Sequence, residues 1–184
     1  MNMRSYLFTR APRWHQYDFG AQKQLSDSLQ SWLTETGSLT QRLKKQYNNQ
    51  FRVDVQIQNW AHCFHDETAI LNQPQHRYQL IREVILQGGN QPVILARTVI
   101  PPETLAFANQ KLSRLGTKPL GEVIFAYPDL KILKRQYSAL PNDVLSSVFR
   151  EIYPANQPLW GRQTIYLIKN HPLMVSEFFL SPLI

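Results

Sequence analysis

The sequence is poor in several features that define large classes of proteins. It contains a single cysteine, Cys63, which excludes an internal disulfide framework and suits a reducing compartment. No apolar run is long enough to span a membrane, and the polar, arginine-bearing N-terminus lacks the apolar stretch of a signal peptide. We therefore expect a cytoplasmic protein with no membrane span.

The common signatures of catalytic chemistry are also missing. The sequence contains no glycine-rich phosphate loop and no motif of a nucleophilic triad. Residues 62–67 include histidine, cysteine and carboxylate side chains, but no second cluster follows at the spacing that a zinc site needs. We interpret this segment as a loop that continues to residue 74, and we predict no metal site.

Positive charge is in excess, with 20 Lys and Arg against 13 Asp and Glu, a net charge of +7. Such a balance indicates either an anionic partner or a solvated basic surface. The densest basic groups, residues 42–45 and 131–135, are short and contain few aromatic residues, so we expect no nucleic-acid binding. With 184 residues and 43% hydrophobic content, the chain is predicted to form one globular domain over residues 1–184, with residues 1–20 as an irregular lead-in.

The most informative stretch covers residues 77–101, which read as two β-strands around a turn at residues 88–90. Each strand has an apolar face with one arginine in its middle, Arg82 on the first and Arg97 on the second. If Gly89 and Asn90 form a two-residue loop, these arginines lie directly opposite each other. Two opposed guanidiniums repel, so the arrangement makes sense if an anion sits between them. In the alternative, a bulge turns one arginine to solvent, or one pairs with a structural carboxylate.

Other segments complete an α+β pattern, and we expect an antiparallel sheet with helices packed on one side. Helices are predicted over residues 21–33, from Leu39 after the capping pair Ser38 and Gln41, over 102–115 and over 142–153. Further strands are predicted over residues 51–60, 163–169 and 173–180, with a turn at 170–172, whereas 119–125 read as a turn and a short apolar segment.

The last predicted strand places Glu177 on an apolar face with Leu173, Val175 and Phe179. This carboxylate is either the partner of one of the two arginines in a buried ion pair, or a carboxyl that holds or donates a proton. A pocket of two arginines and one glutamate suits a small, largely apolar anion with a polar group at its far end.

The order of several segments resembles the chorismate pyruvate-lyase family, over most of residues 25–182. The segments that carry the resemblance are residues 37–40, 80–84, 96–101, 104–105, 115–121, 160–162 and 175–180. The resemblance implies an antiparallel sheet with helical flaps over a buried ligand site. It also implies cleavage of chorismate to 4-hydroxybenzoate and pyruvate for ubiquinone synthesis, without metal or organic cofactor, by a protein that we expect to be a monomer.

Residue roles follow from the same resemblance. Arg82 would hold the ring carboxylate with the backbone N–H of Leu120, and Arg97 would take the enolpyruvyl carboxylate. Glu177 would meet the ring hydroxyl near the backbone of Leu39. An alternative is a non-catalytic module that senses a small anion, because effector domains of bacterial transcription regulators resemble this fold. Since only residues 1–20 precede the first predicted helix, such a module would act with a separate DNA-binding partner.

Overall fold

The computed structural model describes residues 4–16, 25–108, 111–152, 158–180 and 183. Its centre is a single antiparallel sheet of six strands in the order β1-β2-β3-β6-β5-β4. The strands are β1 (Phe51–Ala61), β2 (Gln79–Gly88), β3 (Gln91–Ile100), β4 (Leu130–Leu140), β5 (Leu159–Ile168) and β6 (His171–Phe179). The predicted α+β class with an antiparallel sheet is therefore confirmed.

Two tight hairpins build the centre of the sheet. Gly89 adopts a positive φ of 63° between β2 and β3, as the predicted turn requires. Between β5 and β6, Lys169 and Asn170 both have positive φ, 47° and 70°. This turn begins one residue before the predicted one, because the left-handed conformation falls on Lys169 and Asn170 rather than on the residues that follow.

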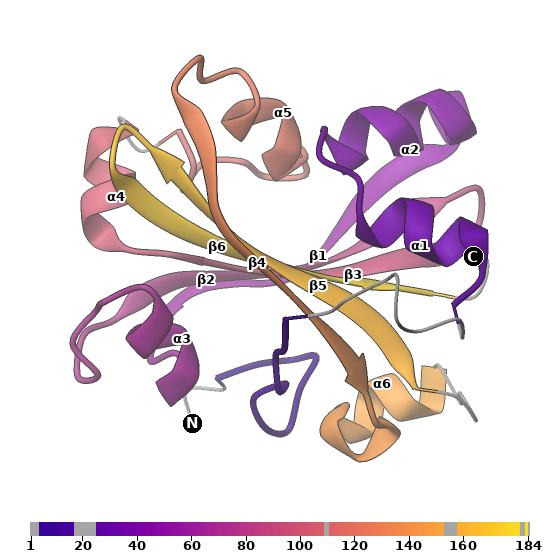
Figure 1. Cartoon of the computed structure of the whole chain (residues 1–184), viewed down its shortest axis with the longest axis horizontal. Helices are drawn as coiled ribbons and strands as arrows, with labels where there is room; N and C mark the ends of the chain where they lie inside the picture. The colour runs from indigo at the N-terminus through magenta and orange to yellow at the C-terminus, as the bar shows by residue number, and fades with distance from the viewer. Residues whose placement is uncertain (1–3, 17–24, 109–110, 153–157, 181–182, 184) are drawn as a thin grey trace.

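Helices cover both faces of the sheet, so the expectation of helices on one side is wrong (Figure 1). The helices are α1 (Asp27–Leu33), α2 (Leu39–Tyr47), α3 (His65–Ile70), α4 (Pro102–Phe107), α5 (Leu120–Ile124) and α6 (Ser147–Ile152), with the 3-10 turns η1 (Asn48–Gln50) and η2 (Asn142–Val144). In Figure 1, α1, α2 and α5 lie above the sheet, whereas α3, α6 and the N-terminal segment lie below it. Among the described residues no helix has the length and apolar character to cross a membrane.

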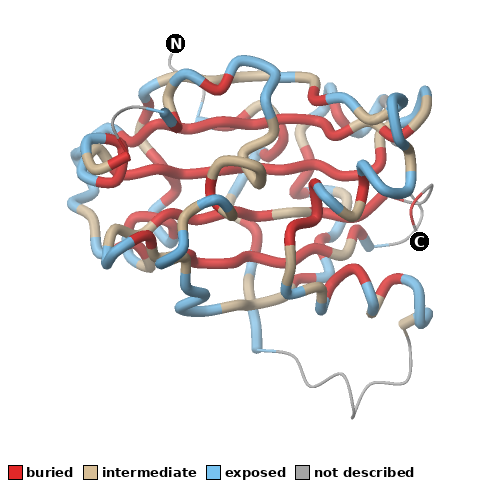
Figure 2. The backbone as a smooth tube through the Cα atoms, turned by 90° about the horizontal axis from the view of Figure 1, so that it is seen from above, coloured by how far each residue is buried: buried red, intermediate tan, exposed pale blue. Residues whose placement is uncertain are grey.

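Burial explains why both faces are covered. In Figure 2 the central strands are buried along most of their length. On β2, Leu80 and Val84 pack on one side of the sheet, and Ile81 and Ile85 pack on the other. Strands that are apolar on both faces need a layer against each of them, which the helices and the N-terminal segment supply.

Several segments differ from their predicted structure. The helix predicted over 102–115 ends at Phe107, as α4, and residues 111–115 are not helical. Residues 130–140 form the edge strand β4, which was missed because Lys131, Lys134 and Arg135 hide its alternation. Residues 65–70 form α3 rather than a loop, with the Glu67 carboxylate accepting a hydrogen bond from the Phe64 backbone N–H. Residues 120–124 form the short helix α5. The helix predicted over 21–33 begins only at Asp27, after the cap Ser26, and residues 21–24 lie outside the described residues. The helix predicted over 142–153 is divided into η2 and α6, and its Tyr153 lies outside the described residues.

The predicted pairing of Arg82 with Arg97 is wrong. Gly88 pairs with Gln91, as a two-residue loop demands, but a β-bulge between Leu86 and Gln87 shifts the register by one residue. Arg82 is consequently opposite Thr98, and Glu83 is opposite Arg97. Because a shift of one residue exchanges the two faces of a strand, Arg82 and Arg97 point to opposite sides of the sheet.

Candidate active site

A cavity lies between one face of the sheet and the helices α2 and α5, which we call the flap helices. Its volume is about 50 Å³, more than the about 10–15 Å³ that one water molecule needs. Leu39 and Thr40 line it from α2, Leu120 and Gly121 from α5. The sheet supplies three charged side chains, Arg82 from β2, Arg162 from β5 and Glu177 from β6, together with Tyr166 from β5 and apolar residues: Val53, Val84, Leu86, Ala96, Val175.

Arg82 is a buried cation without a matching anion. It is 2% exposed, and its guanidinium donates to Gln58 Oε1 at 2.6 Å and to the Lys118 carbonyl oxygen at 3.4 Å. Within the described parts of the chain, no carboxylate lies within ion-pair distance of it. Burial lowers the pKa of Arg82 below its ordinary value. A buried charge of this kind is costly unless a partner completes it, so this side chain has the chemistry to bind an anion.

Arg162 and Glu177 form the second charged group of the cavity. Arg162 Nε donates to Glu177 Oε2 at 2.8 Å, from a guanidinium that is only 1% exposed. Its Nη1 donates to backbone carbonyls at the end of α1, Trp32 O and Leu33 O, both at 3.4 Å, and to Glu35 O just after the helix, at 2.5 Å. Burial alone would lower the pKa of Arg162, but Glu177 raises it above the ordinary value. Glu177 is thereby held in a fixed position on the floor of the cavity.

Arg97, predicted to bind the substrate, does not line this cavity. It is 1% exposed on the opposite face, where its Nε and Nη2 donate to Glu67 at 2.7 Å and its Nη1 donates to Glu83 at 2.7 Å. Glu83 in turn accepts from Ser5 Oγ at 2.5 Å and from the backbone N–H of Tyr6 at 2.6 Å. The prediction that Arg82 and Arg97 share a pocket is therefore wrong, because Arg97 lies on the other face of the sheet, where it is paired with two carboxylates.

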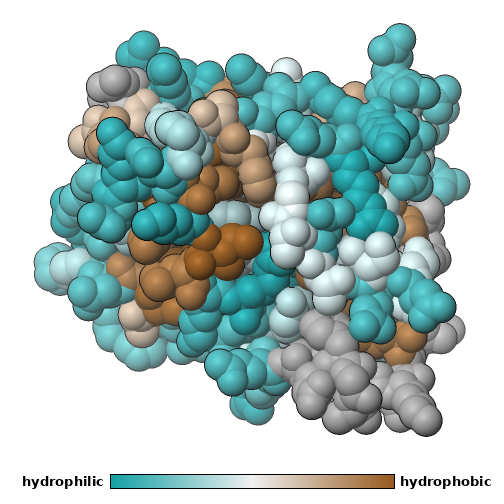
Figure 3. Space-filling model, turned by 45° about the horizontal axis from the view of Figure 1, so that its top comes forward, coloured by the Kyte–Doolittle hydropathy of each residue, from teal (hydrophilic) through white to brown (hydrophobic). Residues whose placement is uncertain are grey.

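The flap helices close on each other above the cavity. Ser38 caps α2 by accepting a hydrogen bond from the Gln41 N–H, as the sequence predicted, and Lys44 of α2 pairs with Glu122 of α5. Gly121 lies against Thr40 so closely that an added Cβ would be 2.7 Å from Thr40 Oγ1. Figure 3 shows the surface on this side of the molecule, where hydrophobic residues gather left of centre among hydrophilic ones.

Sequence reasoning assigned no role to Arg162. The signal for it was present, since Trp160, Arg162, Thr164 and Tyr166 alternate along β5 and place one arginine on the same face as Glu177. The predicted strand begins only at residue 163, so Arg162 lies outside the predicted pattern. As for metals, no three His, Cys, Asp or Glu side chains lie close enough to hold an ion within the described ranges.

Comparisons with known proteins indicate one family. The model of the family described as chorismate lyase matches residues 11–184. A protein of Methylococcus capsulatus named probable chorismate pyruvate-lyase is 38% identical over 152 residues, which cover 83% of this chain and 94% of that protein. A protein of the same name from Thiobacillus denitrificans is 33% identical and covers 85% of this chain and 84% of its own length.

Solved structures share the fold at much lower identity. The effector domain of PhnF from Mycobacterium smegmatis has a TM-score of 0.57 and 14% identity, covering 79% of this chain and 90% of that domain. At this identity the likeness concerns the fold alone. The match of the family model to nearly the whole chain, supported by these relatives, shows that the chain belongs to the chorismate lyase family.

Proposed function

We propose that the protein eliminates pyruvate from chorismate to give 4-hydroxybenzoate. The observation that carries this proposal is Arg82, a buried guanidinium without a carboxylate partner among the described residues, in a cavity closed by two helices. Chorismate is a dicarboxylate with an apolar ring and a hydroxyl group, which is the chemistry that this cavity can complete.

Arg82 binds the ring carboxylate in this proposal. Its contact with the Lys118 carbonyl brings it next to the loop that leads into α5, and Leu120 is the first residue of that helix. The backbone N–H groups of a first helical turn have no partner within the helix. Leu120 can therefore donate a backbone hydrogen bond to the same carboxylate, as the resemblance implied.

The second carboxylate needs a different cation from the one predicted, because Arg97 lies on the other face of the sheet. We assign this role to Arg162, which lines the cavity beside Glu177. Glu177 then meets the ring hydroxyl, with the backbone of Leu39 close by on α2. The two arginines thus face two carboxylates, and the glutamate faces the polar group between them.

The reaction breaks the bond between the ring and the enolpyruvyl oxygen and removes one ring hydrogen as a proton. The ring becomes aromatic, and the released enolpyruvate takes up a proton to become pyruvate. Aromatisation supplies much of the driving force, so the protein mainly orients the substrate, excludes water and stabilises developing charge. Glu177 is the carboxylate in the cavity that can hold the proton or orient the hydroxyl.

We further propose that this reaction needs no metal or organic cofactor, that the protein works as a monomer in the cytoplasm, and that its product feeds ubiquinone synthesis. The free, buried Cys63 suits a reducing compartment. The edge strand β4 carries Lys131 and Lys134 next to a bulge, which disfavours pairing with a second sheet.

The test is turnover by the purified protein. Incubation with chorismate in the presence of a metal chelator is expected to release 4-hydroxybenzoate and pyruvate in equal amounts. The shared fold with effector domains makes a non-catalytic sensing module the second candidate. A protein that binds chorismate but leaves it unchanged would favour that candidate. Activity that disappears on chelation and returns with zinc would contradict the cofactor-free reaction.

A further inference from the structure

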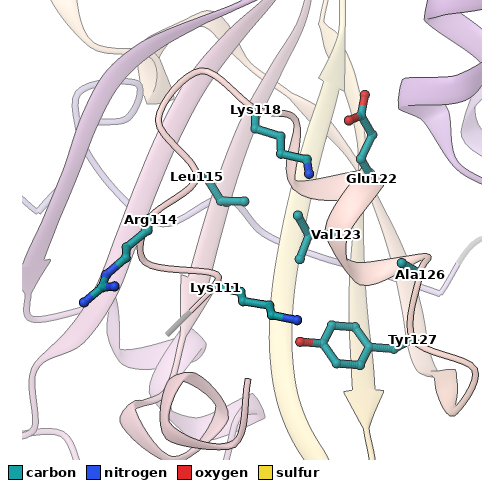
Figure 4. A pocket seen from close by; sticks show the side chains of 8 residues that line it. All are labelled: Lys111, Arg114, Leu115, Lys118, Glu122, Val123, Ala126 and Tyr127. Carbon is teal, nitrogen blue, oxygen red and sulfur yellow. The ribbon is translucent and has the colours of Figure 1, made fainter. Parts of the chain in front are cut away.

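A second hollow lies on the outer side of α5, and we call it the outer groove. It has a volume of about 570 Å³ and is lined by Lys111, Arg114, Leu115, Lys118, Glu122, Val123, Ala126 and Tyr127 (Figure 4). The helix α5 separates it from the cavity, since Leu120, Gly121 and Ile124 line the cavity whereas Glu122 and Val123 line the outer groove. A single short helix therefore has the proposed active site on one face and the outer groove on the other.

The outer groove carries unmatched positive charge. Lys111, Arg114 and Lys118 are exposed, and none of them forms an ion pair with a carboxylate in the described part of the chain. The one carboxylate that lines the groove, Glu122, pairs instead with Lys44 of α2. The net field in the groove is consequently attractive to anions.

The side chains also have the directions that a ligand needs. In Figure 4 the amines of Lys111 and Lys118 extend into the groove on either side of Val123, and the Tyr127 hydroxyl points to Lys111. Arg114 and the carboxylate of Glu122 point away from this space. Two ammonium groups above an apolar surface suit a small ring that carries two carboxylates, with each amine facing one of them.

Lys118 connects the outer groove to the cavity. Its side chain lines the groove, while its carbonyl oxygen accepts the 3.4 Å hydrogen bond from Arg82 inside. A carboxylate that reaches Arg82 is a stronger acceptor than this carbonyl and can take its place. Release of the Lys118 carbonyl would free the loop that leads into α5, next to the groove where the anion first binds.

We propose that the outer groove is a docking site for small ring-bearing dicarboxylates, which captures the substrate before it passes α5 into the cavity. The identity of that substrate rests on the proposed function, whereas the anion site itself rests on Lys111, Lys118 and the apolar surface between them. Capture of this kind raises the rate of association and leaves the chemical step inside the cavity unchanged.

The kinetic test compares two pairs of substitutions with equal loss of charge. Lys111→Gln/Lys118→Gln removes the two amines of the groove. Arg13→Gln/Arg150→Gln removes two exposed charges from segments that cover the opposite face of the sheet.

At about 0.01 M salt, where charges interact over about 30 Å, we expect the groove pair to lower kcat/KM for chorismate about tenfold, with kcat unchanged. The control pair should stay within about twofold of the wild type, and the loss should vanish at about 1 M salt. Equal losses in both pairs, or a fall in kcat alone, would overturn the proposal.

A binding measurement separates this proposal from the proposed function. The probe is isophthalate, an aromatic dicarboxylate that offers no enolpyruvyl group to eliminate, titrated into protein saturated with 4-hydroxybenzoate. We expect shifts in the backbone amide NMR signals of Leu115, Lys118, Val123 and Tyr127, lost in the groove pair and kept in the control pair. No shifts would overturn the groove site even in an active lyase. Shifts in a protein that leaves chorismate intact would reject the lyase function and keep the anion site.

Discussion

Three arginines are buried in the sheet, and their partners give them different roles. Arg97 has two carboxylates, Arg162 has one, and Arg82 has only neutral oxygen atoms among the described residues. Burial alone would lower the pKa of each guanidinium, but Glu67 and Glu83 raise the pKa of Arg97 above its ordinary value. Arg82 is therefore the one of these three arginines whose charge no carboxylate of the described residues balances.

This contrast predicts opposite effects of one substitution at two positions. Arg82→Leu removes a buried charge without leaving a carboxylate behind, so the ligand-free protein should be as stable as the wild type or more so, by up to about 4 kcal/mol. Arg97→Leu leaves Glu67 and Glu83 buried without their cation and should lower the free energy of unfolding by about 3–5 kcal/mol. Denaturant melts of the two variants and the wild type measure both changes in the free energy of unfolding.

Activity separates the two arginines further. Arg82→Leu should abolish chorismate turnover, because the ring carboxylate loses its cation. A ligand-free Arg82→Leu protein that is destabilised by more than about 2 kcal/mol would show that Arg82 belongs mainly to the fold, as one partner of a structural pair does.

Glu177 gives the second prediction at this scale. Glu177→Gln keeps the shape of the side chain but removes its charge and its ability to transfer a proton. We expect kcat to fall about 10²-fold or more if Glu177 is a general acid or base. A loss below about tenfold, measured in single-turnover experiments, would show that the carboxylate only orients the substrate.

The main error in the prediction from sequence concerns the register between two strands, β2 and β3. The sequence correctly indicated that Arg82, Arg97 and Glu177 are charged residues within apolar strands. It did not indicate on which face of the sheet Arg97 lies. On β3 the residues Ile94 and Ala96 are buried on one face and Leu95 and Val99 on the other. When both faces are apolar, a slip of one residue changes no hydrophobic pattern, so the bulge near Leu86 left no trace in the sequence.

The edge strand and the short helices escaped detection for a different reason. β4 carries its lysines on a solvent-facing edge, where charge protects against pairing, and α3 and α5 span only 6 and 5 residues. Helices this short owe their stability to tertiary contacts rather than to propensity. The predicted strand over residues 51–60, by contrast, agrees closely with β1, and the Ser38 cap placed the start of α2 at Leu39.

The close approach of the flap helices gives a prediction at the scale of the element. Gly121→Ala would bring its Cβ to 2.7 Å from Thr40 Oγ1 and 3.2 Å from Ser38 Oγ, so the flap helices could not close fully. We expect about tenfold weaker binding of 4-hydroxybenzoate, a change of about 1.4 kcal/mol, and faster product release. Stability should not fall, because alanine favours a helix more than glycine does.

Two companion variants check that steric contact is the cause. Gly37→Ala brings its Cβ near only the flexible end of Glu35, at 3.2 Å, and should bind 4-hydroxybenzoate as the wild type does. Adding Thr40→Ala to Gly121→Ala removes the contacting hydroxyl and should restore much of the affinity. Unchanged binding by Gly121→Ala alone, in a titration followed by fluorescence, would mean that the flap helices do not need this contact.

At the scale of the whole molecule, the two faces of the sheet differ in what they carry. One face carries the cavity under the flap helices, where Arg82 is buried without a carboxylate partner among the described residues. The other face carries the closed network of Arg97, Glu67 and Glu83, which also receives hydrogen bonds from Ser5 and from the backbone of Tyr6. The network ties the N-terminal segment to the sheet, so the ligand-free fold does not depend on filling the cavity.

Ligand binding should therefore appear as added global stability. At a concentration of 100 times its Kd, 4-hydroxybenzoate is expected to stabilise the protein by about 2.7 kcal/mol, which corresponds to a rise in Tm of about 5–10 °C for a chain of this size.

Benzoate lacks the hydroxyl that Glu177 is proposed to meet and loses a hydrogen bond to a charged group, so it should bind about tenfold more weakly or worse. Neither ligand should stabilise the Arg82→Leu variant. In the Glu177→Gln variant, the affinities for 4-hydroxybenzoate and benzoate should differ less than in the wild type. Thermal unfolding at several ligand concentrations measures all of these quantities. Equal binding of 4-hydroxybenzoate and benzoate by the wild type would show that Glu177 does not contact the ring hydroxyl, and would move its role from substrate recognition to the positioning of Arg162.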